Sequence, residues 1–309
     1  MPAEPRPSSP GGTPPLVVAM GGFDGVHLGH QQIISHARAM AEQRDGMTGV
    51  LTFDPLPAQL IHPDFTYVLT PLAEKTRILT ELGVELVHVI RFDESVRRTP
   101  PEEFVRRHII EPLHPAAVVV GHDHRFGDRA RGDADLLRRL LAAEGVDLEI
   151  VPEFIFLGAP VRSTRIREHL LLGAVRRAAE LLGRWYTLTG EIVSGTGTGR
   201  KLGFPTINLR PRERETLVPA DGVYVCRVDA RGRRFDAVLN IGHRPTFGGE
   251  TRTIEAHLID QDLDQQPTEA TFHIIERLRP ERRFTSASAL SAQIADDIAA
   301  ARATLAGLT

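Results

Sequence analysis

The chain has 309 residues, with 37 basic and 40 acidic side chains, a formal net charge of −3 and 25% charged residues. At roughly 100–200 residues per domain, this length predicts two domains. The balanced charge argues against a surface that coats nucleic acid, and the 41% hydrophobic content excludes a disordered or fibrous chain. No apolar run approaches the roughly 18–20 residues of a membrane span.

The cysteine count and the amino terminus bear on the compartment. Cys226 is the single cysteine, so the chain forms neither an internal disulfide nor a multi-cysteine metal site. Residues 1–15 are rich in proline and lack an apolar core segment, which predicts a disordered tail and no secretory signal. We therefore expect a soluble, cytoplasmic protein.

Short apolar runs alternate with helical patterns in the first half of the chain. The runs cover residues 16–20, 50–53, 86–90, 116–120 and 146–151. Near-continuous apolar strands that alternate with helices indicate a parallel sheet covered on both faces. Helical patterns over residues 164–172 and 174–182 follow, so we expect an α/β domain over residues 16–183.

The pattern changes after Gly183. Strand-like runs separated by turn-rich segments cover residues 186–193, 223–228, 235–239, 253–259 and 270–278. Several short strands in succession predict a small antiparallel barrel. Apolar residues then recur on a helical face from Leu290 to Leu305, so residues 184–309 are expected to form a β-barrel domain with a terminal helix.

The segment GGFDGVHLGH at residues 21–30 joins the first predicted strand to the first predicted helix. Ligands of open α/β sheets bind at the carboxyl ends of strands, where helix N-termini offer free N–H groups. Glycines let the backbone approach a phosphate, and histidines three residues apart stabilise charge that develops at phosphorus. The alternative to a phosphate-binding loop is a glycine-rich turn with incidental histidines, and the specific HLGH tetrad argues against that alternative. A zinc site lacks an evident third ligand.

This segment resembles the signature of the nucleotidyltransferase superfamily, and more closely that of bifunctional riboflavin kinase/FAD synthetases. Further resemblance lies in residues 53–57, 69–75, 121–127 and 163–167. It implies a Rossmann-like amino-terminal domain in which the phosphate of FMN attacks the α-phosphorus of ATP. Pyrophosphate leaves, FAD forms, and Mg²⁺ bridges phosphate oxygens.

The resemblance assigns roles to individual residues of this half. His27, His30 and Arg167 are the expected catalytic groups, since cationic and N–H donors offset phosphate charge. Ser163 and Thr164 offer hydroxyl and N–H groups to the nucleotide, although a simple helix cap is the alternative. The other expected nucleotide-binding residues are Gly21, Phe23, Asp24 and Gly29, and the expected flavin-binding residues are Asp123, Arg125 and Phe126.

A second glycine-rich segment precedes the sequence Phe-Pro-Thr-Ile-Asn at residues 204–208. A flap over nucleotide phosphates is expected from Gly195, Gly197, Gly199, Arg200 and Lys201, although glycine-rich turns are common. Thr206 and Asn208 point the same way in an extended segment. Their hydroxyl and amide oxygens suit Mg²⁺, while polar groups on the wet face of a strand are the alternative.

An alternating segment supplies a candidate base. Glu255 and His257 share one face of the strand predicted over residues 253–259, and a solvent-facing role is the alternative for Glu255 alone. Downstream of the Thr/Asn pair, Glu255 resembles the catalytic glutamate of riboflavin kinases. The resemblance implies that Glu255 accepts the proton of the terminal ribityl hydroxyl, whose oxygen attacks the γ-phosphorus of ATP.

Other functions stay open beside a bifunctional enzyme that binds riboflavin, FMN and ATP. Leu56, His124 and Arg162 stand where the family usually has histidine, phenylalanine and serine, and the loop at Gln265 lacks a Tyr-Gly turn. One alternative is therefore a riboflavin kinase with weak or lost FAD synthetase activity, and another is a flavin-binding regulatory protein. Interspersed acids disfavour nucleic acid as a partner. No membrane partner is expected, and the sequence leaves the oligomeric state open.

Overall fold

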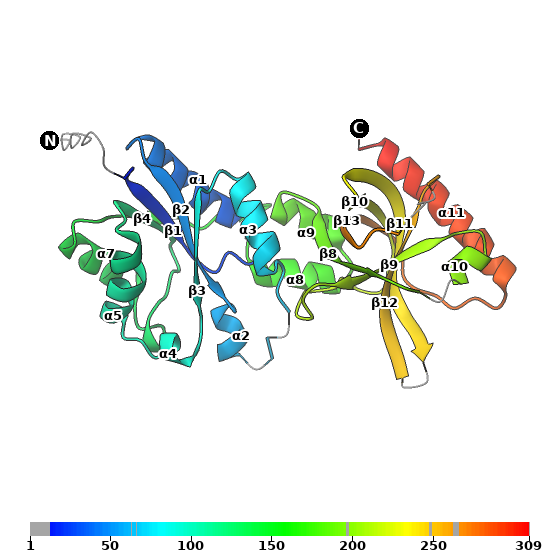
Figure 1. Cartoon of the computed structure of the whole chain (residues 1–309), viewed down its shortest axis with the longest axis horizontal. Helices are drawn as coiled ribbons and strands as arrows, with labels where there is room; N and C mark the ends of the chain where they lie inside the picture. Colours follow the sequence, from blue (N-terminus) through cyan, green and yellow to red (C-terminus); the bar gives the residue numbers. More distant parts are fainter. Residues whose placement is uncertain are drawn as a thin grey trace. The chain divides into compact units, whose positions relative to one another are not determined.

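The computed structural model describes residues 13–62, 64–65, 67–195, 198–246, 249–261 and 266–308 (Figure 1). The chain divides into two compact units. The first unit comprises Met1–Thr66 and Lys75–Pro160, and the second comprises Tyr67–Glu74 and Val161–Thr309. Residues 1–12 of the predicted tail lie outside the described part of the chain. The domain boundary expected after residue 183 stays a prediction.

The first unit is built on a five-stranded sheet with the order β3-β2-β1-β4-β5, in which every pair is parallel. Its strands are β1 (Leu16–Met20), β2 (Met47–Asp54), β3 (Leu86–Arg91), β4 (Ala117–Gly121) and β5 (Asp147–Val151). The predicted α/β fold is therefore confirmed. The central strands are buried along almost their whole length, which is why they appear as continuous apolar runs in the sequence.

Helices cover both faces of this sheet. Val17 and Ala19 of β1 pack in one core cluster with residues of α1 and α3, whereas Val18 and Met20 pack in another with residues of α5 and α7, because successive strand residues face opposite ways. The helices are α1 (Leu28–Glu42), α2 (Pro57–Ile61), α3 (Leu72–Glu81), α4 (Glu94–Arg97), α5 (Pro101–Val105), the π-helix η1 (Arg106–Ile110), α6 (Glu111–Leu113), the 3₁₀-helix η2 (Asp128–Ala130) and α7 (Ala134–Ala143). A short hairpin, β6 (Ile155–Phe156) and β7 (Ala159–Pro160), follows.

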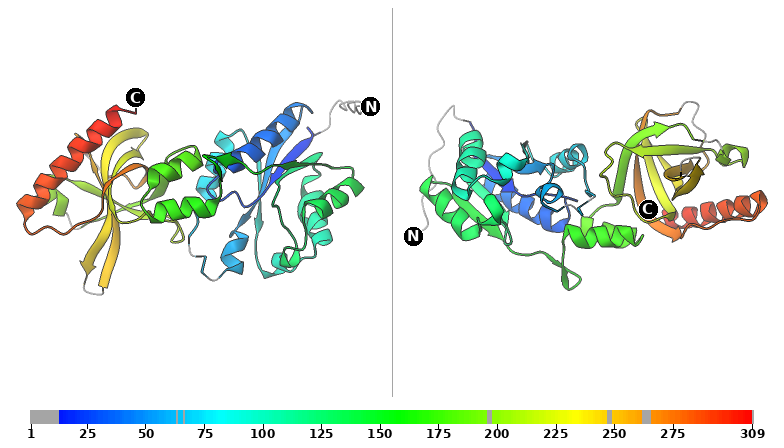
Figure 2. Two further views of the ribbon diagram at one scale, coloured as in Figure 1. Left: turned by 180° about the vertical axis from the view of Figure 1, so that it is seen from behind. Right: turned by 90° about the horizontal axis from the view of Figure 1, so that it is seen from below.

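The second unit contains a closed barrel with the strand order β10-β11-β12-β9-β8-β13, as predicted (Figure 2). Its strands are β8 (Tyr186–Val193), β9 (Thr206–Pro211), β10 (Gly222–Ala230), β11 (Arg233–Thr246), β12 (Gly249–Leu258) and β13 (Glu269–Arg279). Its helices are α8 (Ser163–Leu171), α9 (Val175–Leu182), α10 (Thr198–Lys201) and α11 (Ala287–Ala306). The apolar runs did not reveal β9, because only Ile207 and Leu209 of this strand are buried and apolar.

The terminal helix α11 packs on the outside of the barrel against β10, β11 and β13 (Figure 2). Its buried Ala301 and Leu305 join a cluster with residues of β10, β11 and β13, and Trp185 packs against that cluster. A buried ion pair adds a second attachment, since Arg279 of β13 contacts Asp297 of α11 at 2.8 Å. The side chain of Asp297 is only 6% exposed and also accepts a hydrogen bond from Gln293. No described helix has both the length and the apolar character needed to cross a membrane.

We predict that Asp297→Ala lowers the free energy of unfolding of the barrel by about 3 kcal/mol, since it leaves the charge of Arg279 largely buried without a partner. Urea unfolding followed by the fluorescence of Trp185, the single tryptophan, measures this loss. Arg302→Ala is the matched control, because it removes the exposed pair of Arg302 with Asp260 from the same helix and should cost less than about 0.5 kcal/mol. Equal effects of the two variants would contradict the prediction.

Candidate active sites

The loop between β1 and α1 is held in its shape by buried side chains. Phe23, Gly25 and Val26 have positive φ angles of 49°, 86° and 40°. Val26 donates its N–H to the carbonyl oxygen of Phe23 at 3.1 Å, and the side chains of Phe23 and Val26 are fully buried in the core. Core packing therefore holds two non-glycine residues in a disfavoured backbone conformation, as is common at ligand-binding loops.

A buried lysine anchors the start of this loop. Lys75 of α3 is 2% exposed, and its Nζ donates to the carbonyl oxygen of Gly22 at 3.0 Å and to that of Phe53 at 3.3 Å. The hydroxyl of Thr52 donates to the same Gly22 oxygen at 3.1 Å and lies 3.3 Å from Nζ. A buried ammonium is costly unless it is hydrogen-bonded, so Lys75 is committed to holding the loop. The sequence analysis noted the motif at residues 69–75, but only the burial of Lys75 shows that this side chain holds the loop.

His27 and His30 meet at the N-terminus of α1; Gly21, Phe23 and Asp24 belong to the loop that precedes this helix, and Gly29 is its second residue. Their rings are stacked, with centroids 3.7 Å apart and planes 15° apart. Nδ1 of His27, the N-cap, accepts the backbone N–H of His30 at 3.3 Å. Because an N–H group only donates, a neutral His27 carries its proton on Nε2. The junction thus combines an Nε2–H donor with the end of the helix that favours anions.

The predicted flavin-binding residues lie in the loop after β4. Asp123 is exposed, and Arg125 is exposed and pairs with Asp133 at 3.7 Å. Phe126 is 6% exposed, because it packs in the core beside Phe104, with ring centroids 6.0 Å apart. Most of the Phe126 surface is therefore already covered by protein.

His124 in the same loop has an unusual environment. Its ring stacks on Phe126 with centroids 5.9 Å apart, and its Nε2 is buried with no hydrogen-bond partner among the described residues. Burial lowers the pKa of His124 to about 4, although the nearby carboxylate of Asp123 opposes the shift. The imidazole is therefore neutral at physiological pH.

The predicted phosphate-binding residues near α8 belong to the second unit. The N-cap of α8 is Arg162, so Ser163 and Thr164 occupy the first turn and the alternative that either caps the helix is wrong. The first-turn N–H groups of a helix have no partner within the helix. Nε of Arg167 donates to the carbonyl oxygen of Tyr67 at 3.0 Å, which attaches α8 to the segment Tyr67–Glu74 of this unit.

A cavity of about 400 Å³ lies in the second unit, beside the face of β11 and β12 that points away from the barrel interior. Polar side chains from three strands line one wall, and apolar residues of α11 and of residues 202–204 line others. Arg279, Glu281 and Arg282 bring both signs of charge to its edge. A mainly apolar cavity with a few converging polar groups is typical of a small-molecule site.

Strand register aligns the polar wall. In the β12–β9 ladder, Glu255 pairs with Asn208 and His257 pairs with Thr206, while Asn240 of β11 pairs with Glu255 from the other side. Directly paired residues of antiparallel strands carry their side chains on one face, roughly 4.5–5.5 Å apart at Cβ. The structure thus brings together the predicted Glu255, Thr206 and Asn208, and adds two neighbours that the sequence analysis did not assign.

The glycine-rich segment packs closely on this wall. A side chain at Gly195 would overlap the amide group of Asn208, and one at Gly199 would overlap the carbonyl oxygen of Phe204. Glycine is therefore required at Gly199, where the clash is with the backbone, whereas a side chain at Gly195 would have to displace the Asn208 amide. Arg200 is exposed on α10, whereas Gly197 and the side chain of Lys201 lie outside the described residues. The hydroxyl of Thr206 and the amide oxygen of Asn208 lie on one face of β9 as hard donors, which fits a divalent metal.

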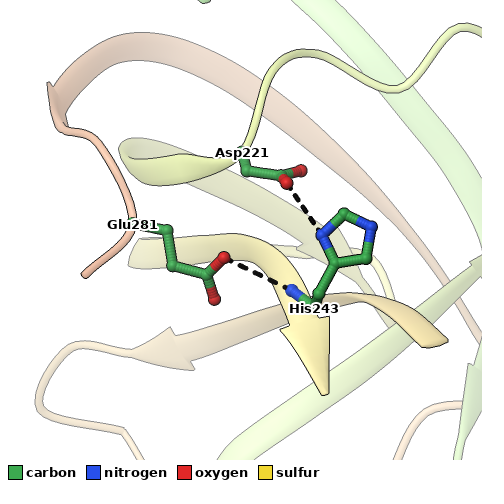
Figure 3. Close-up of side chains that lie close together, drawn as sticks. All are labelled: Asp221, His243 and Glu281. Atoms are coloured by element: carbon green, nitrogen blue, oxygen red, sulfur yellow. Dashed lines mark hydrogen bonds and ion pairs between the residues drawn. The ribbon is translucent and has the colours of Figure 1, made fainter. Parts of the chain in front are cut away.

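Three ionisable residues, Asp221, His243 and Glu281, lie close together, and Glu281 also lines the cavity (Figure 3). Nδ1 of His243 lies 2.8 Å from a carboxylate oxygen of Asp221, and Arg252 contacts the other oxygen at 2.8 Å. The backbone N–H of His243 donates to Glu281 at 3.4 Å, and Gly242 leaves the space that this carboxylate fills. Among the described residues, Asp221, His243 and Glu281 are the one group close enough to share a metal ion. Because both oxygens of Asp221 are already paired, we interpret the cluster as a polar network in which Asp221 fixes the His243 side chain and the His243 backbone N–H contacts Glu281.

Comparison with known proteins gives matches over both units. Residues 11–165 match the family model described as FAD synthetase, and residues 182–305 match that described as riboflavin kinase. The chain is 34% identical to the bifunctional riboflavin kinase/FMN adenylyltransferase of Listeria monocytogenes over 91% of this chain and 90% of that protein. The Escherichia coli K12 protein of the same description is also 34% identical, over 93% and 91%.

A solved structure is similar over nearly the whole length. The crystal structure of a protein described as a macrolide-efflux protein from Streptococcus pneumoniae has a TM-score of 0.86 and 30% sequence identity. The match covers 94% of this chain and 95% of that one.

We predict that His124 makes the stability of the first unit depend on pH. Because the pKa in the folded state, about 4, lies below the ordinary value of 6.5, the unfolded chain binds the proton first as the pH falls. The stability of the folded unit is therefore undiminished above pH 6.5 and falls as the pH drops towards 4. At pH 5 the loss in the free energy of unfolding is on the order of 1–2 kcal/mol.

The variant His124→Phe keeps a ring against Phe126 but does not titrate. Urea unfolding followed by far-UV circular dichroism at pH 7 and pH 5 should show a smaller loss of stability for His124→Phe than for the wild type. An unchanged pH dependence would refute the assignment to His124.

Proposed function

The chain belongs to the family of bifunctional riboflavin kinase/FMN adenylyltransferases, and on that premise we propose how its residues divide the two reactions. The barrel unit phosphorylates riboflavin to FMN, and the α/β unit adenylylates FMN to FAD with release of pyrophosphate. Both reactions consume ATP. The observation that carries this assignment is the register of β12, which sets Glu255 opposite Asn208 and His257 opposite Thr206, with Glu255, His257 and Thr206 all lining the cavity.

In the kinase reaction, Glu255 is the general base. Its carboxylate accepts the proton of the terminal ribityl hydroxyl, and the hydroxyl oxygen then attacks the γ-phosphorus of ATP while ADP leaves. Thr206 and Asn208 would hold the divalent metal, which would neutralise phosphate charge when bound. The apolar side of the cavity, which includes Phe204 and Leu290, offers a surface for the flavin ring.

In the adenylylation reaction, the protein supplies positioning and charge stabilisation, not a nucleophile. A phosphate oxygen of FMN attacks the α-phosphorus of ATP, and pyrophosphate leaves. His27, with its Nε2–H, and the adjacent His30 act on the phosphate oxygens at the N-terminus of α1. Arg167, with Ser163 and Thr164, is assigned to the phosphates because its position in the chain matches the family motif.

The finer points of the proposal concern the metal and the compartment. Mg²⁺ is the proposed metal, since hydroxyl and amide oxygens are hard ligands and phosphates complete its shell. The cytoplasm is the proposed compartment. Cys226 is a free thiol, completely buried in the barrel, and burial raises its pKa, so it is an inert core residue compatible with reducing conditions.

We expect Glu255→Gln to lower the rate of FMN formation at least about 100-fold, because the amide cannot accept the proton. The conversion of FMN to FAD should stay at the wild-type rate, since Glu255 lines the barrel cavity and is not among the residues assigned to adenylylation. Chromatography of reactions supplied separately with riboflavin or FMN, each with ATP and Mg²⁺, measures both steps. Normal FMN formation in this variant would refute the assigned base.

We expect the opposite pattern from His27→Ala. Loss of a preorganised donor should slow FAD formation from FMN roughly 100-fold, while riboflavin phosphorylation continues unchanged. The same assay decides whether the adenylylation half is active in the wild type, where FMN without FAD would support a kinase alone. Loss of both activities in a folded His27→Ala protein would contradict the division into two sites.

A further inference from the structure

The cavity wall contains a histidine that has no role in the steps above. His257 lies on β12, two residues from Glu255 and on the same strand face, and its ring lines the cavity. It pairs across the ladder with Thr206. His257 is therefore a neighbour of the proposed base along β12 and of the proposed metal ligand Thr206 across the ladder.

One hydrogen bond defines the orientation of this ring. Nδ1 of His257 lies 2.8 Å from the carbonyl oxygen of Pro205. Because a carbonyl oxygen only accepts, Nδ1 must carry the proton. Pro205 immediately precedes β9, so this hydrogen bond ties the imidazole to the peptide that leads into Thr206.

A second contact involves the preceding residue. The ring of Phe204 meets the imidazole edge to face, with centroids 5.6 Å apart and planes 87° apart. His257 thus contacts two consecutive residues, one through a hydrogen bond and one through an aromatic contact. Together these contacts fix the peptide that leads into Thr206.

The same peptide supports the glycine-rich segment. The N–H of Phe204 donates to the carbonyl oxygen of Gly199 at 2.8 Å, and the chain reverses between them through Gly203, whose φ is +87°. Gly199 lies so close to the Phe204 carbonyl that no side chain fits. The position of α10 therefore depends on the peptide that His257 holds.

We propose that His257 is a positioning residue of the kinase reaction. By holding residues 204 and 205, it sets the distance between Thr206 and Glu255 and seats the glycine-rich segment over the nucleotide. Phosphoryl transfer requires the hydroxyl and the metal-bound phosphate within near-attack distance, so loss of this contact should weaken MgATP binding and slow turnover. The inference rests on the proposed function, because it takes Glu255 as base and Thr206 as metal ligand.

Two amide variants separate the two nitrogens of the ring. The amide of His257→Asn takes the place of Nδ1 and retains a donor for the Pro205 carbonyl, whereas the amide of His257→Gln takes the place of Nε2. We expect His257→Gln and His257→Phe to raise the KM for MgATP about tenfold, which corresponds to ~1.4 kcal/mol, and to lower kcat. His257→Asn should stay within about threefold of the wild type. The KM for riboflavin should change less than that for MgATP in every variant.

Two controls keep a folding defect apart from a positioning defect. FAD formation from FMN is assigned to other residues (His27, His30 and Arg167) and should be unchanged in all three variants. His273→Asn changes another partly buried barrel histidine, which pairs with Asp229 at 2.9 Å and does not line the cavity, so its kinase constants should match the wild type. Equal losses in His273→Asn and His257→Gln would overturn the proposal.

Other results also decide the matter. If His257→Gln is active and His257→Asn is not, the working contact is through Nε2 and the proposal is wrong. Wild-type constants in His257→Gln and His257→Phe, with Glu255→Gln inactive, would reject the positioning role while leaving the proposed base intact. Full kinase activity in Glu255→Gln would instead reject the proposed function itself.

Discussion

The pairing register of β12 between β11 and β9 is the constraint on which the cavity of the barrel unit depends. Ile254, Ala256 and Leu258 are buried, whereas Glu255 and His257 line the cavity on the opposite face. A slip of one residue would exchange these faces and place a carboxylate and an imidazole in the apolar core. Burial of the three apolar side chains thus specifies that Glu255 and His257 point into the cavity.

The site of the first unit is held in shape by a different kind of contact. The loop between β1 and α1 is irregular, so no strand pairing holds it. Its backbone is held instead by the buried side chains of Phe23, Val26 and Lys75. In both units, then, functional groups extend from a backbone whose conformation is set by buried neighbours. That arrangement suits reactions that the protein accelerates by positioning and by fixed charges, because reorganisation during the reaction is avoided.

Long-range attachments complete the barrel unit. The buried Arg279–Asp297 pair joins β13 to α11, and both residues also line the cavity. Glu281, which also lines the cavity, accepts a hydrogen bond from the backbone N–H of His243, whose side chain is paired with Asp221. The terminal helix and the segment after β13 are therefore walls of the site as well as parts of the fold.

The sequence by itself determined the α/β and barrel folds, the glycine and histidine motif at α1, and the alternation that exposes Glu255 on one strand face. These features depend on local periodicity and on residues close together in the chain. Tertiary structure decided the role of Lys75, the burial of Phe126 and of Nε2 of His124, the strand β9 and the grouping of α8 and α9 with the barrel. It also brought His257 to Pro205, 52 positions away in the chain. Periodicity reports which residues are buried but not what they pack against, since pairing register depends on the whole core.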